Sequence, residues 1–363
     1  MSNEPPLDFQ VLHEFIKKAH INLNRNIWDY LIGGTETETG VKRNRLALDT
    51  VALRPRVLVD VSEIDCSWDF FGKRIRLPVA LAPVGSLESF DVGGGASTAK
   101  GAGAFGVPLF ASSVTQPGLE EIGRAGEGPK VFQLYVRGGD DFIDDYVRRA
   151  VDAGYDAFCI TVDTAHYSRR ERDTAKRFVK SWRPVDPVLQ LNQAKLNWGH
   201  IERFKARHSI PLILKGIATV EDAERAVGVG VDAVYVSNHG GRQLDHGRGS
   251  LEVLPEIVAA VGGRAKVFVD GGFSRGTDII KGIALGADLV LVGRLFCYAL
   301  AAAGAAGLVR MLEILENEVH QSLGLLGVTS FRQVGRDHVC PAPSPTLPHV
   351  HSAFPLLNLD SPF

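Results

Sequence analysis

Residues 235–245, YVSNHGGRQLD, place an imidazole and a guanidinium three positions apart, directly after an apolar run. The imidazole of His239 titrates near neutral pH, so beside a carboxylate it can act as a general base. The planar guanidinium of Arg242 can hold a carboxylate through two parallel hydrogen bonds. These two side chains therefore predict proton transfer on a small molecule that carries a carboxylate.

Eight short apolar runs between residues 78 and 294 end in polar residues or glycine. Each run is rich in Val, Ile, Leu and Phe and is apolar throughout, which is typical of strands buried on both faces. A single polar strand end is usually a cap or a turn, but all eight together indicate a binding site. The residues at these ends are Val84, Gly85, Ser112, Ser113, Gln133, Tyr135, Thr161, Asp163, Lys215, His239, Arg242, Asp270, Gly271, Gly272, Gly293 and Arg294.

The chemistry of these strand ends indicates a cofactor. The glycines after the seventh and eighth runs would let backbone N–H groups approach a phosphate, and Arg294 could add a charged fork. Lys215 would be costly to bury unpaired, so we expect it to face an anion or an electron-rich ring. The amides of Gln133 and Asn238 suit the edge of a heterocycle. A phosphate, a planar ring and a cation together predict a mononucleotide.

The spacing of the runs predicts the fold. Their ends recur about every 23–31 residues with helical stretches between them, as in eight βα units that close into a barrel of about 250 residues. We expect a (β/α)8 TIM barrel over residues 79–340, with a helical lead-in over 1–78 packed on it. The gap between Asp163 and Lys215 is about twice as long and predicts an excursion over one barrel end. The Pro-rich tail, 341–363, would be disordered or lie along the surface.

A doubly wound open sheet is the alternative fold. It usually needs fewer strands and a Gly-rich first turn. The only candidate for that turn, DVGGGAS at residues 91–97, does not have the spacing of a dinucleotide-binding loop. The barrel is therefore favoured.

Composition excludes several other classes of protein. The chain has 363 residues, with 40 Lys+Arg against 42 Asp+Glu, so no basic excess suggests nucleic acid. We expect no apolar run to reach the roughly 18 residues of a membrane span, and the start MSNEPPLDFQ has neither the basic start nor the apolar core of a signal peptide. We expect a cytoplasmic protein that binds neither nucleic acid nor membranes. The four cysteines lack metal-ligand spacing, so we expect inert thiols and no metal site.

With these residues in view, the chain resembles the FMN-dependent α-hydroxy acid oxidase and dehydrogenase family, which includes glycolate oxidase, lactate oxidase and mandelate dehydrogenase. The resemblance covers about residues 10 to 340. SNHGGRQLD is specific to that family, and RPRVL, FQLYV, TVDT, LKG, DGG and LVGR occur in the family's order. It implies FMN as cofactor, an L-2-hydroxy acid as substrate, oxygen or another soluble electron acceptor, and a homotetramer.

Two rival functions stay open on the sequence. One is an FMN barrel without net oxidation, such as an isomerase, although the His-x-x-Arg pair argues against it. The other is a flavin-binding protein that has lost turnover. Failure of every 2-hydroxy acid to reduce the flavin would favour the second.

By position, the resemblance implies that His239 is the catalytic base and that Asp163 orients it and stabilises its charged form. Lys215 matches the lysine at the pyrimidine end of the flavin, where it would stabilise the negative charge of reduced FMN. The other residues that match contacts to the flavin ring, the ribityl chain or the phosphate are Val84, Gly85, Ser112, Gln133, Thr161, Asp270, Gly272, Gly293 and Arg294.

The resemblance also implies how the substrate is bound. Arg242 and Tyr30 match the ligands of the substrate carboxylate. Tyr135 matches the tyrosine that hydrogen-bonds the substrate hydroxyl. Arg170, in SRRERD, matches a second active-site arginine.

One departure from the family pattern affects the phosphate. The family's motif usually reads Asp-Gly-Gly-x-Arg, but the arginine position is Ser274 here, and Arg275 follows it. Either Arg275 substitutes from a shifted position or Arg294 holds the phosphate alone. FMN binding is then expected to be weaker than usual.

Three further departures affect the substrate and the oxidant. Val114 occupies a position that is often a bulky aromatic in oxidases of small acids, and the excursion between Arg177 and His208 is shorter than the usual lid. Both changes predict a substrate larger than glycolate, such as an aryl or long-chain acid. Gly85 stands where fast oxidases tend to have alanine, which leaves oxidase, dehydrogenase and monooxygenase activities open.

Overall fold

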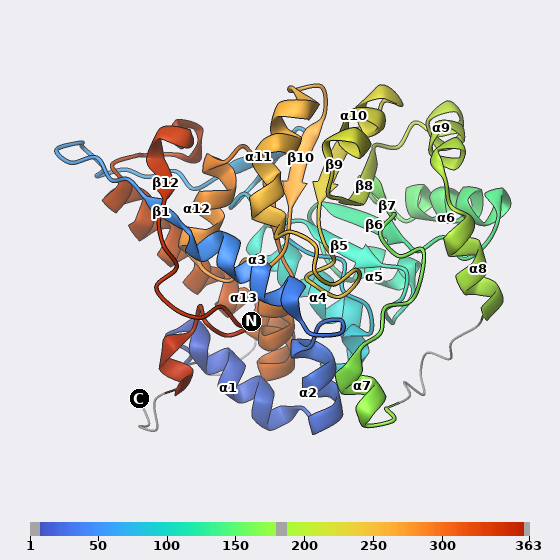
Figure 1. Ribbon diagram of the computed structural model, residues 1–363, viewed down its shortest axis with the longest axis horizontal. Helices are drawn as coiled ribbons and strands as arrows, with labels where there is room; N and C mark the ends of the chain where they lie inside the picture. Colours follow the sequence, from blue (N-terminus) through green and yellow to red (C-terminus); the bar gives the residue numbers. More distant parts are fainter. Residues whose placement is uncertain (1–7, 179–186, 359–363) are drawn as a thin grey trace.

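Eight parallel strands form a closed barrel in the computed structural model, which describes residues 8–178 and 187–358 (Figure 1). The strand order around the barrel is β10-β11-β4-β5-β6-β7-β8-β9, so that each strand pairs with its neighbour in sequence and β11 closes on β4. All eight predicted strands are present, and the TIM barrel is confirmed. Their bounds are β4 Val79–Leu81, β5 Leu109–Ser112, β6 Lys130–Leu134, β7 Ala157–Thr161, β8 Leu212–Ile217, β9 Ala233–Val236, β10 Lys266–Val269 and β11 Leu289–Val292.

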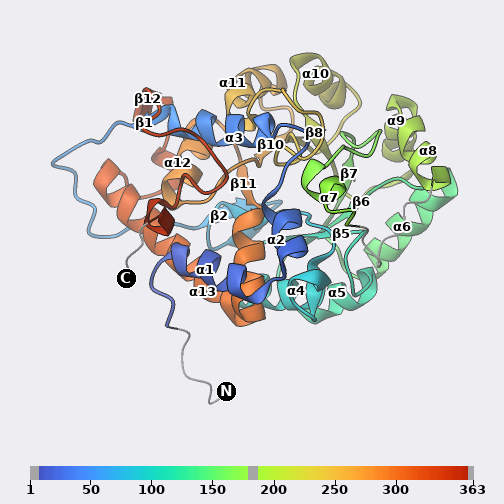
Figure 2. The ribbon, with the colours of Figure 1, turned by 60° about the horizontal axis from the view of Figure 1, so that its bottom comes forward.

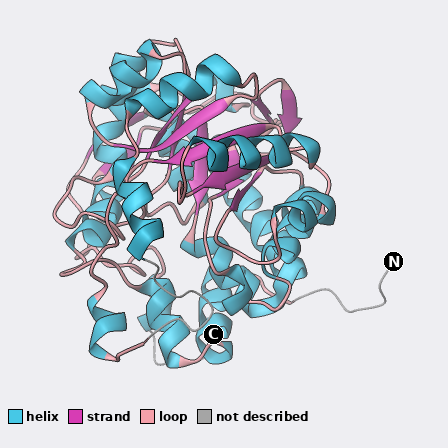
Figure 3. Cartoon of the chain, turned by 90° about the vertical axis from the view of Figure 1, so that its right-hand side faces the viewer, coloured by secondary structure: helices cyan, strands magenta, loops and turns pink. Residues whose placement is uncertain are grey.

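Helices surround the barrel on its outside (Figure 3). Thr219 caps the start of α10, because its side chain accepts the N–H of Asp222 and so satisfies a first-turn donor. The helices that follow strands are α4 Gly94–Phe105, α5 Leu119–Ala125, α6 Asp140–Asp152, α10 Val220–Gly228, α11 Ser250–Val261, α12 Gly276–Ala284 and α13 Arg294–Leu326.

The excursion after β7 is helical. It contains α7 Glu171–Ala175, α8 Pro187–Lys195 and α9 Trp198–Arg207. Gln193 of α8 is buried and donates to the carbonyl of Thr161 at 3.2 Å, which ties the excursion to the end of β7. Part of the shortened lid, residues 179–186, lies outside the described residues.

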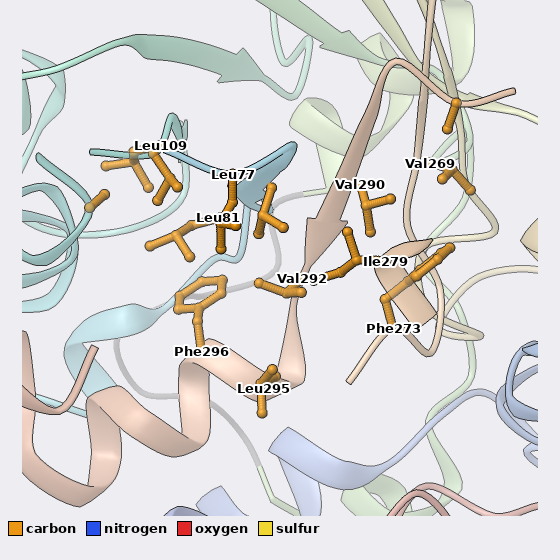
Figure 4. Close-up of a cluster of buried hydrophobic side chains, with 14 of the residues drawn as sticks. Leu77, Leu81, Leu109, Val269, Phe273, Ile279, Val290, Val292, Leu295 and Phe296 are labelled. Carbon is orange, nitrogen blue, oxygen red and sulfur yellow. The ribbon is translucent and has the colours of Figure 1, made fainter. Parts of the chain in front are cut away.

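Two hydrophobic layers hold the barrel together. Inward-facing residues, such as Phe110, Tyr235 and Phe268, fill its interior, and each is 2% exposed or less. Outward-facing strand residues pack against helix residues such as Leu295 and Phe296 in a second layer (Figure 4). Burying one large apolar side chain stabilises the fold by about 1.5–3 kcal/mol, so these layers fix the strand ends that carry polar groups.

The lead-in contains helices α1 Leu12–Asn22, α2 Arg25–Ile32 and α3 Thr39–Asp49, followed by strands β1 Val51–Leu53, β2 Trp68–Phe70 and β3 Lys73–Ile75. The helices agree with the predicted helical lead-in, but the hairpin of β2 and β3 was not predicted. Phe70 of this hairpin belongs to the interior core of the barrel, where its ring stacks on Phe268 with centroids 6.1 Å apart. The hairpin is therefore part of the barrel core.

One described helix, α13, is long and apolar enough to cross a membrane, with a mean hydropathy of 1.7 over 18 residues. The expectation that no such run exists is wrong. However, 67% of that window is buried, and the helix packs against α1, α4 and α12. Non-helical dihedral angles at Ala303 and Gly304 also interrupt it. These features are those of a core helix.

The C-terminal tail follows the molecule rather than leaving it. Strand β12, Val339–Pro341, pairs antiparallel with β1, and the next residues run back beside α1 and α13 (Figure 2). Phe354 is 1% exposed, and its ring lies edge-on to His13 with centroids 5.4 Å apart. The tail was predicted either to be disordered or to lie along the surface. Its described part is ordered and packs against the rest of the molecule.

Candidate active site

A cavity of about 1190 Å³, counting its space open to solvent, lies where the strands end. Pockets for small molecules and cofactors are commonly of this size or somewhat smaller. Most of the predicted site residues line it together: Tyr30, Val84, Gly85, Tyr135, Arg170, Lys215, His239, Arg242, Asp270, Gly272, Gly293 and Arg294. Residues that are distant in sequence thus meet in one cavity, as expected for the carboxyl end of a barrel.

His239 and Asp163 form the hydrogen-bonded pair that acid–base chemistry needs. The Nδ1 of His239 lies 3.0 and 3.2 Å from the two carboxylate oxygens of Asp163. With Nδ1–H donated to the carboxylate, Nε2 is the free basic atom, and it lies 3.2 Å from the hydroxyl of Tyr135. A ligand in the cavity beside these two side chains would therefore meet a hydroxyl and a proton acceptor together.

The glycines of the motif allow this placement of His239. His239 itself has φ +60°, and Gly240 and Gly241 continue in the left-handed region at +64° and +74°. A Cβ on Gly241 would come within 2.5 Å of the backbone nitrogen of Val41. Because only glycine tolerates both the dihedral angles and the close approach, the pair lets the chain turn sharply after β9.

Burial and neighbouring charges set the protonation of the pair. Burial lowers the pKa of His239, the charge of Lys215 lowers it further, and Asp163 offsets only part of the effect. Burial alone would raise the pKa of Asp163, but the interaction with His239, which includes a hydrogen bond, and the charge of Lys215 lower it. A neutral imidazole therefore faces the cavity at neutral pH, with an ionised carboxylate behind it.

Arginines gather at the C-terminal end of α2. One Nη atom of Arg242 donates to the carbonyls of Tyr30 and Gly33, both at 2.7 Å, and its guanidinium lies 4.8 Å from the centre of the Tyr30 ring. Arg294 donates to the carbonyls of Leu31, Gly33 and Gly240 at 2.8–3.2 Å. The carbonyl end of a helix carries partial negative charge, which favours these cations.

The cavity has an excess of positive charge. Burial, followed by the charge of Arg170, lowers the pKa of Arg242, and burial also lowers the pKa of Arg294. Among the described lining residues the cations are Arg45, Arg170, Lys215, Arg242 and Arg294. Arg45 pairs with Asp278 at 2.8 Å and Lys215 lies 4.0 Å from Asp270, whereas Arg170, Arg242 and Arg294 have no ion pair within the described residues. Buried cations without paired anions are costly. The cavity therefore favours anionic ligands, which fits a phosphate and a substrate carboxylate.

Lys215 is held by a buried network beneath the cavity. Its Nζ donates to Ser237 at 3.0 Å, and Asp270 accepts from the hydroxyls of Ser237 and Tyr235, both at 2.7 Å. Burial opposes the charge of Lys215, but Asp163 and Asp270 raise its pKa, so the cation is retained. Sequence analysis missed Ser237 and Tyr235, although a tyrosine in an otherwise aliphatic strand was a signal.

Three predicted flavin-contact residues form a hydrogen-bonded ladder on β5, β6 and β7. The Ser112 hydroxyl donates to the amide oxygen of Gln133 at 2.7 Å, and the Gln133 amide nitrogen donates to Thr161 at 2.8 Å. All three side chains are 2% exposed or less and none is among the lining residues. The ladder fixes the orientation of the Gln133 amide, which has a second N–H to offer a ring edge.

The end of the cavity at β10 and β11 has the features of a phosphate site. Gly272 has φ +85°, and a Cβ on Gly293 would meet nothing within 4 Å, so the backbone there is open to a ligand. Helix α13 begins at Arg294, and the N–H groups of a first helical turn lack acceptors within the helix. These residues fit a phosphate monoester.

Arg275 is not at this end, and its predicted role is corrected. It is absent from the described lining, because its guanidinium pairs with Glu318 of α13 at 2.6 Å and donates to the carbonyl of Ala353 at 3.2 Å. Asp278 accepts the backbone N–H groups of Ser274 and Arg275, which fixes this turn at the start of α12. Of the two arginines, Arg294 does line the cavity, where its guanidinium donates to backbone carbonyls.

Sequence comparison identifies the class of protein that this barrel and cavity belong to. The family described as FMN-dependent dehydrogenase matches residues 19–341. The chain is 41% identical over 339 residues to 4-hydroxymandelate oxidase of Amycolatopsis orientalis, covering 88% of this chain and 95% of that one. It is 36% identical over 348 residues to glycolate oxidase 3 of Arabidopsis thaliana, covering 90% and 94%.

Solved structures agree with the sequence comparison. A crystal structure of mandelate oxidase with (S)-2-phenylpropionate superposes with a TM-score of 0.86 at 39% identity, covering 93% of this chain and 99% of that one. The chain belongs to the FMN-dependent dehydrogenase family. Its cofactor is FMN, and it is an oxidoreductase of the 2-hydroxy acid oxidase type.

Proposed function

We propose that this enzyme oxidises an L-2-hydroxy acid larger than glycolate, such as an aryl or long-chain acid, to the 2-oxo acid. The observation that carries the proposal is Val114, a small side chain in the wall of the cavity that also contains Tyr135 and His239. The similarity to 4-hydroxymandelate oxidase and to mandelate oxidase supports an aryl acid. We further propose that oxygen or another soluble acceptor removes the electrons.

In the proposed reaction the guanidinium of Arg242 and the hydroxyl of Tyr30 bind the substrate carboxylate, and Tyr135 binds the substrate hydroxyl. FMN supplies the two-electron acceptor when it is bound. His239 accepts a proton at Nε2, and Asp163 stabilises the imidazolium that results. Lys215 places a buried positive charge at the floor of the cavity, where it would stabilise negative charge on the reduced cofactor.

The size of the pocket is tested by Val114→Trp. The larger side chain should lower kcat/KM for mandelate by roughly tenfold or more, because it fills space that an aryl group needs. Turnover of glycolate or lactate should change much less. Steady-state rates of the wild-type enzyme and of Val114→Trp with glycolate, lactate, mandelate and 2-hydroxyoctanoate test this prediction. Wild-type preference for glycolate over every bulkier acid would contradict the proposed substrate class.

The pH dependence tests the state of the base. Because the pKa of His239 is lowered below its ordinary value of 6.5, the imidazole should be neutral and active at pH 7. We expect kcat/KM to be flat around neutral pH and to fall as pH decreases through an apparent pKa below 6.5. A profile of kcat/KM from pH 5 to pH 9 measures this apparent pKa. An acid limb centred above pH 7 would show that the base is not the buried imidazole.

A further inference from the structure

The C-terminal tail contributes to the cofactor cavity, although it lies beyond the part of the chain that matches the family. The family match ends at residue 341. Val350 nevertheless lines the cavity together with Ser274, Arg294 and Tyr298. The described tail, residues 342–358, thus contributes Val350 to the wall of the cavity.

His351 fixes the tail beside the cavity. Its Nε2 lies 3.1 Å from the hydroxyl of Tyr298, which is itself a lining residue. The imidazole also stacks on Trp28 of α2, with ring centroids 5.8 Å apart and planes 30° from parallel. Burial lowers the pKa of His351 to about 4, so the contact is made by a neutral ring at physiological pH.

Arg275 is the second anchor of the tail. It donates to the carbonyl of Ala353, and its guanidinium lies 5.9 Å from the centre of the buried Phe354 ring. Its two ion-pair contacts with Glu318, at 2.6 and 3.2 Å, hold the guanidinium in this direction. Arg275, one of the two arginines considered for the phosphate, thus binds the tail segment that contributes Val350 to the cavity wall.

This arrangement would compensate for Ser274. Where the family usually places an arginine, this chain has a short hydroxyl side chain that lines the cavity. An apolar, uncharged wall excludes water, and electrostatic interactions become stronger where water is excluded. The remaining contacts from Arg294 and the backbone N–H groups would then hold a phosphate more tightly.

We propose that residues 342–358 form part of the FMN-binding site, closing its phosphate end and slowing FMN release, with Arg275 as the positioning residue. The proposal rests on the cofactor and not on the identity of the substrate. FMN binding can be measured without turnover, so the two proposals can fail separately.

The test compares FMN and riboflavin, which lacks the phosphate, on the wild-type chain and on a chain ending at Pro341. Flavin fluorescence on dilution gives the dissociation rate. Loss of the tail should raise the FMN dissociation rate by about tenfold or more and should change riboflavin binding much less. Equal effects on both flavins, or an FMN rate within about twofold of wild type, would overturn the proposal.

Point variants keep the test valid if the shortened chain folds poorly. Val350→Asp should speed FMN release in the full-length chain, whereas Leu347→Ala, an 89% exposed position in the same segment, should not.

Arg275→Ala should also speed FMN release, but it should add little once the tail is removed, because it acts through the tail. An undiminished effect of Arg275→Ala in the shortened chain would instead indicate direct phosphate contact and refute the anchoring role. Unchanged FMN release in Val350→Asp would refute the closing role.

Discussion

His239→Gln is expected to slow flavin reduction by a 2-hydroxy acid by about 10²–10⁴-fold, the usual contribution of a positioned general base. Glutamine keeps a polar side chain of similar length but cannot accept a proton at neutral pH. FMN should remain bound, because the phosphate end of the cavity is formed by other residues. Anaerobic stopped-flow absorbance of the flavin measures the rate directly.

Asp163→Asn is the matched control for this variant. It removes the charge that stabilises imidazolium and the acceptor for Nδ1–H, but it leaves the imidazole in place. We expect an intermediate loss of rate, with the flavin absorbance spectrum little changed. If His239→Gln reduced its flavin at nearly the wild-type rate, the assignment of the base would be wrong.

Arg242→Met is expected to raise the dissociation constant of the substrate by about 100-fold. Hydrogen bonds to charged groups contribute about 1.5–3 kcal/mol each, and a bidentate carboxylate contact loses at least one of them completely. The apolar replacement keeps most of the volume of the side chain but removes the charge. Titration of the oxidised enzyme with a 2-oxo acid, which binds without reacting, gives the dissociation constant.

Arg242→Lys separates charge from geometry. Lysine keeps the positive charge but lacks the planar fork, so only part of the affinity should return. The hydrogen bonds of Arg242 to the carbonyls of Tyr30 and Gly33 would also be lost, so thermal stability should be measured beside affinity. An unchanged dissociation constant in both variants would show that the carboxylate binds elsewhere, for which Arg170 is the other arginine near Tyr30.

The barrel and the composition of its site could be predicted because both depend on local patterns. A strand buried on both faces must be apolar throughout, and eight such runs with polar ends have few other arrangements. The pairing of His239 with Asp163 was implied by the family resemblance, and the structure confirms it at the ends of β9 and β7, which lie on either side of β8.

The direction of long side chains and the path of the tail could not be predicted in the same way. Arg275 is adjacent in sequence to the phosphate motif, but its guanidinium is directed by Glu318, a partner 43 residues away. The proline-rich tail was predicted to be disordered or to lie along the surface. Phe354 is instead buried against α1, where its ring contacts His13. Contacts between segments distant in sequence determine both the direction of the Arg275 side chain and the path of the tail. Local sequence patterns do not predict such contacts.

The most direct test of the central claim is an anaerobic absorbance titration of the purified protein with glycolate, lactate and mandelate, followed by admission of air. We predict that mandelate bleaches the flavin band at low concentration, because His239 accepts the proton and Arg242 and Tyr30 bind the carboxylate. Recolouring on admission of air would then measure how well oxygen serves as the acceptor. A yellow protein that none of these acids bleaches would contradict the assignment of the cavity as a site for 2-hydroxy acid oxidation.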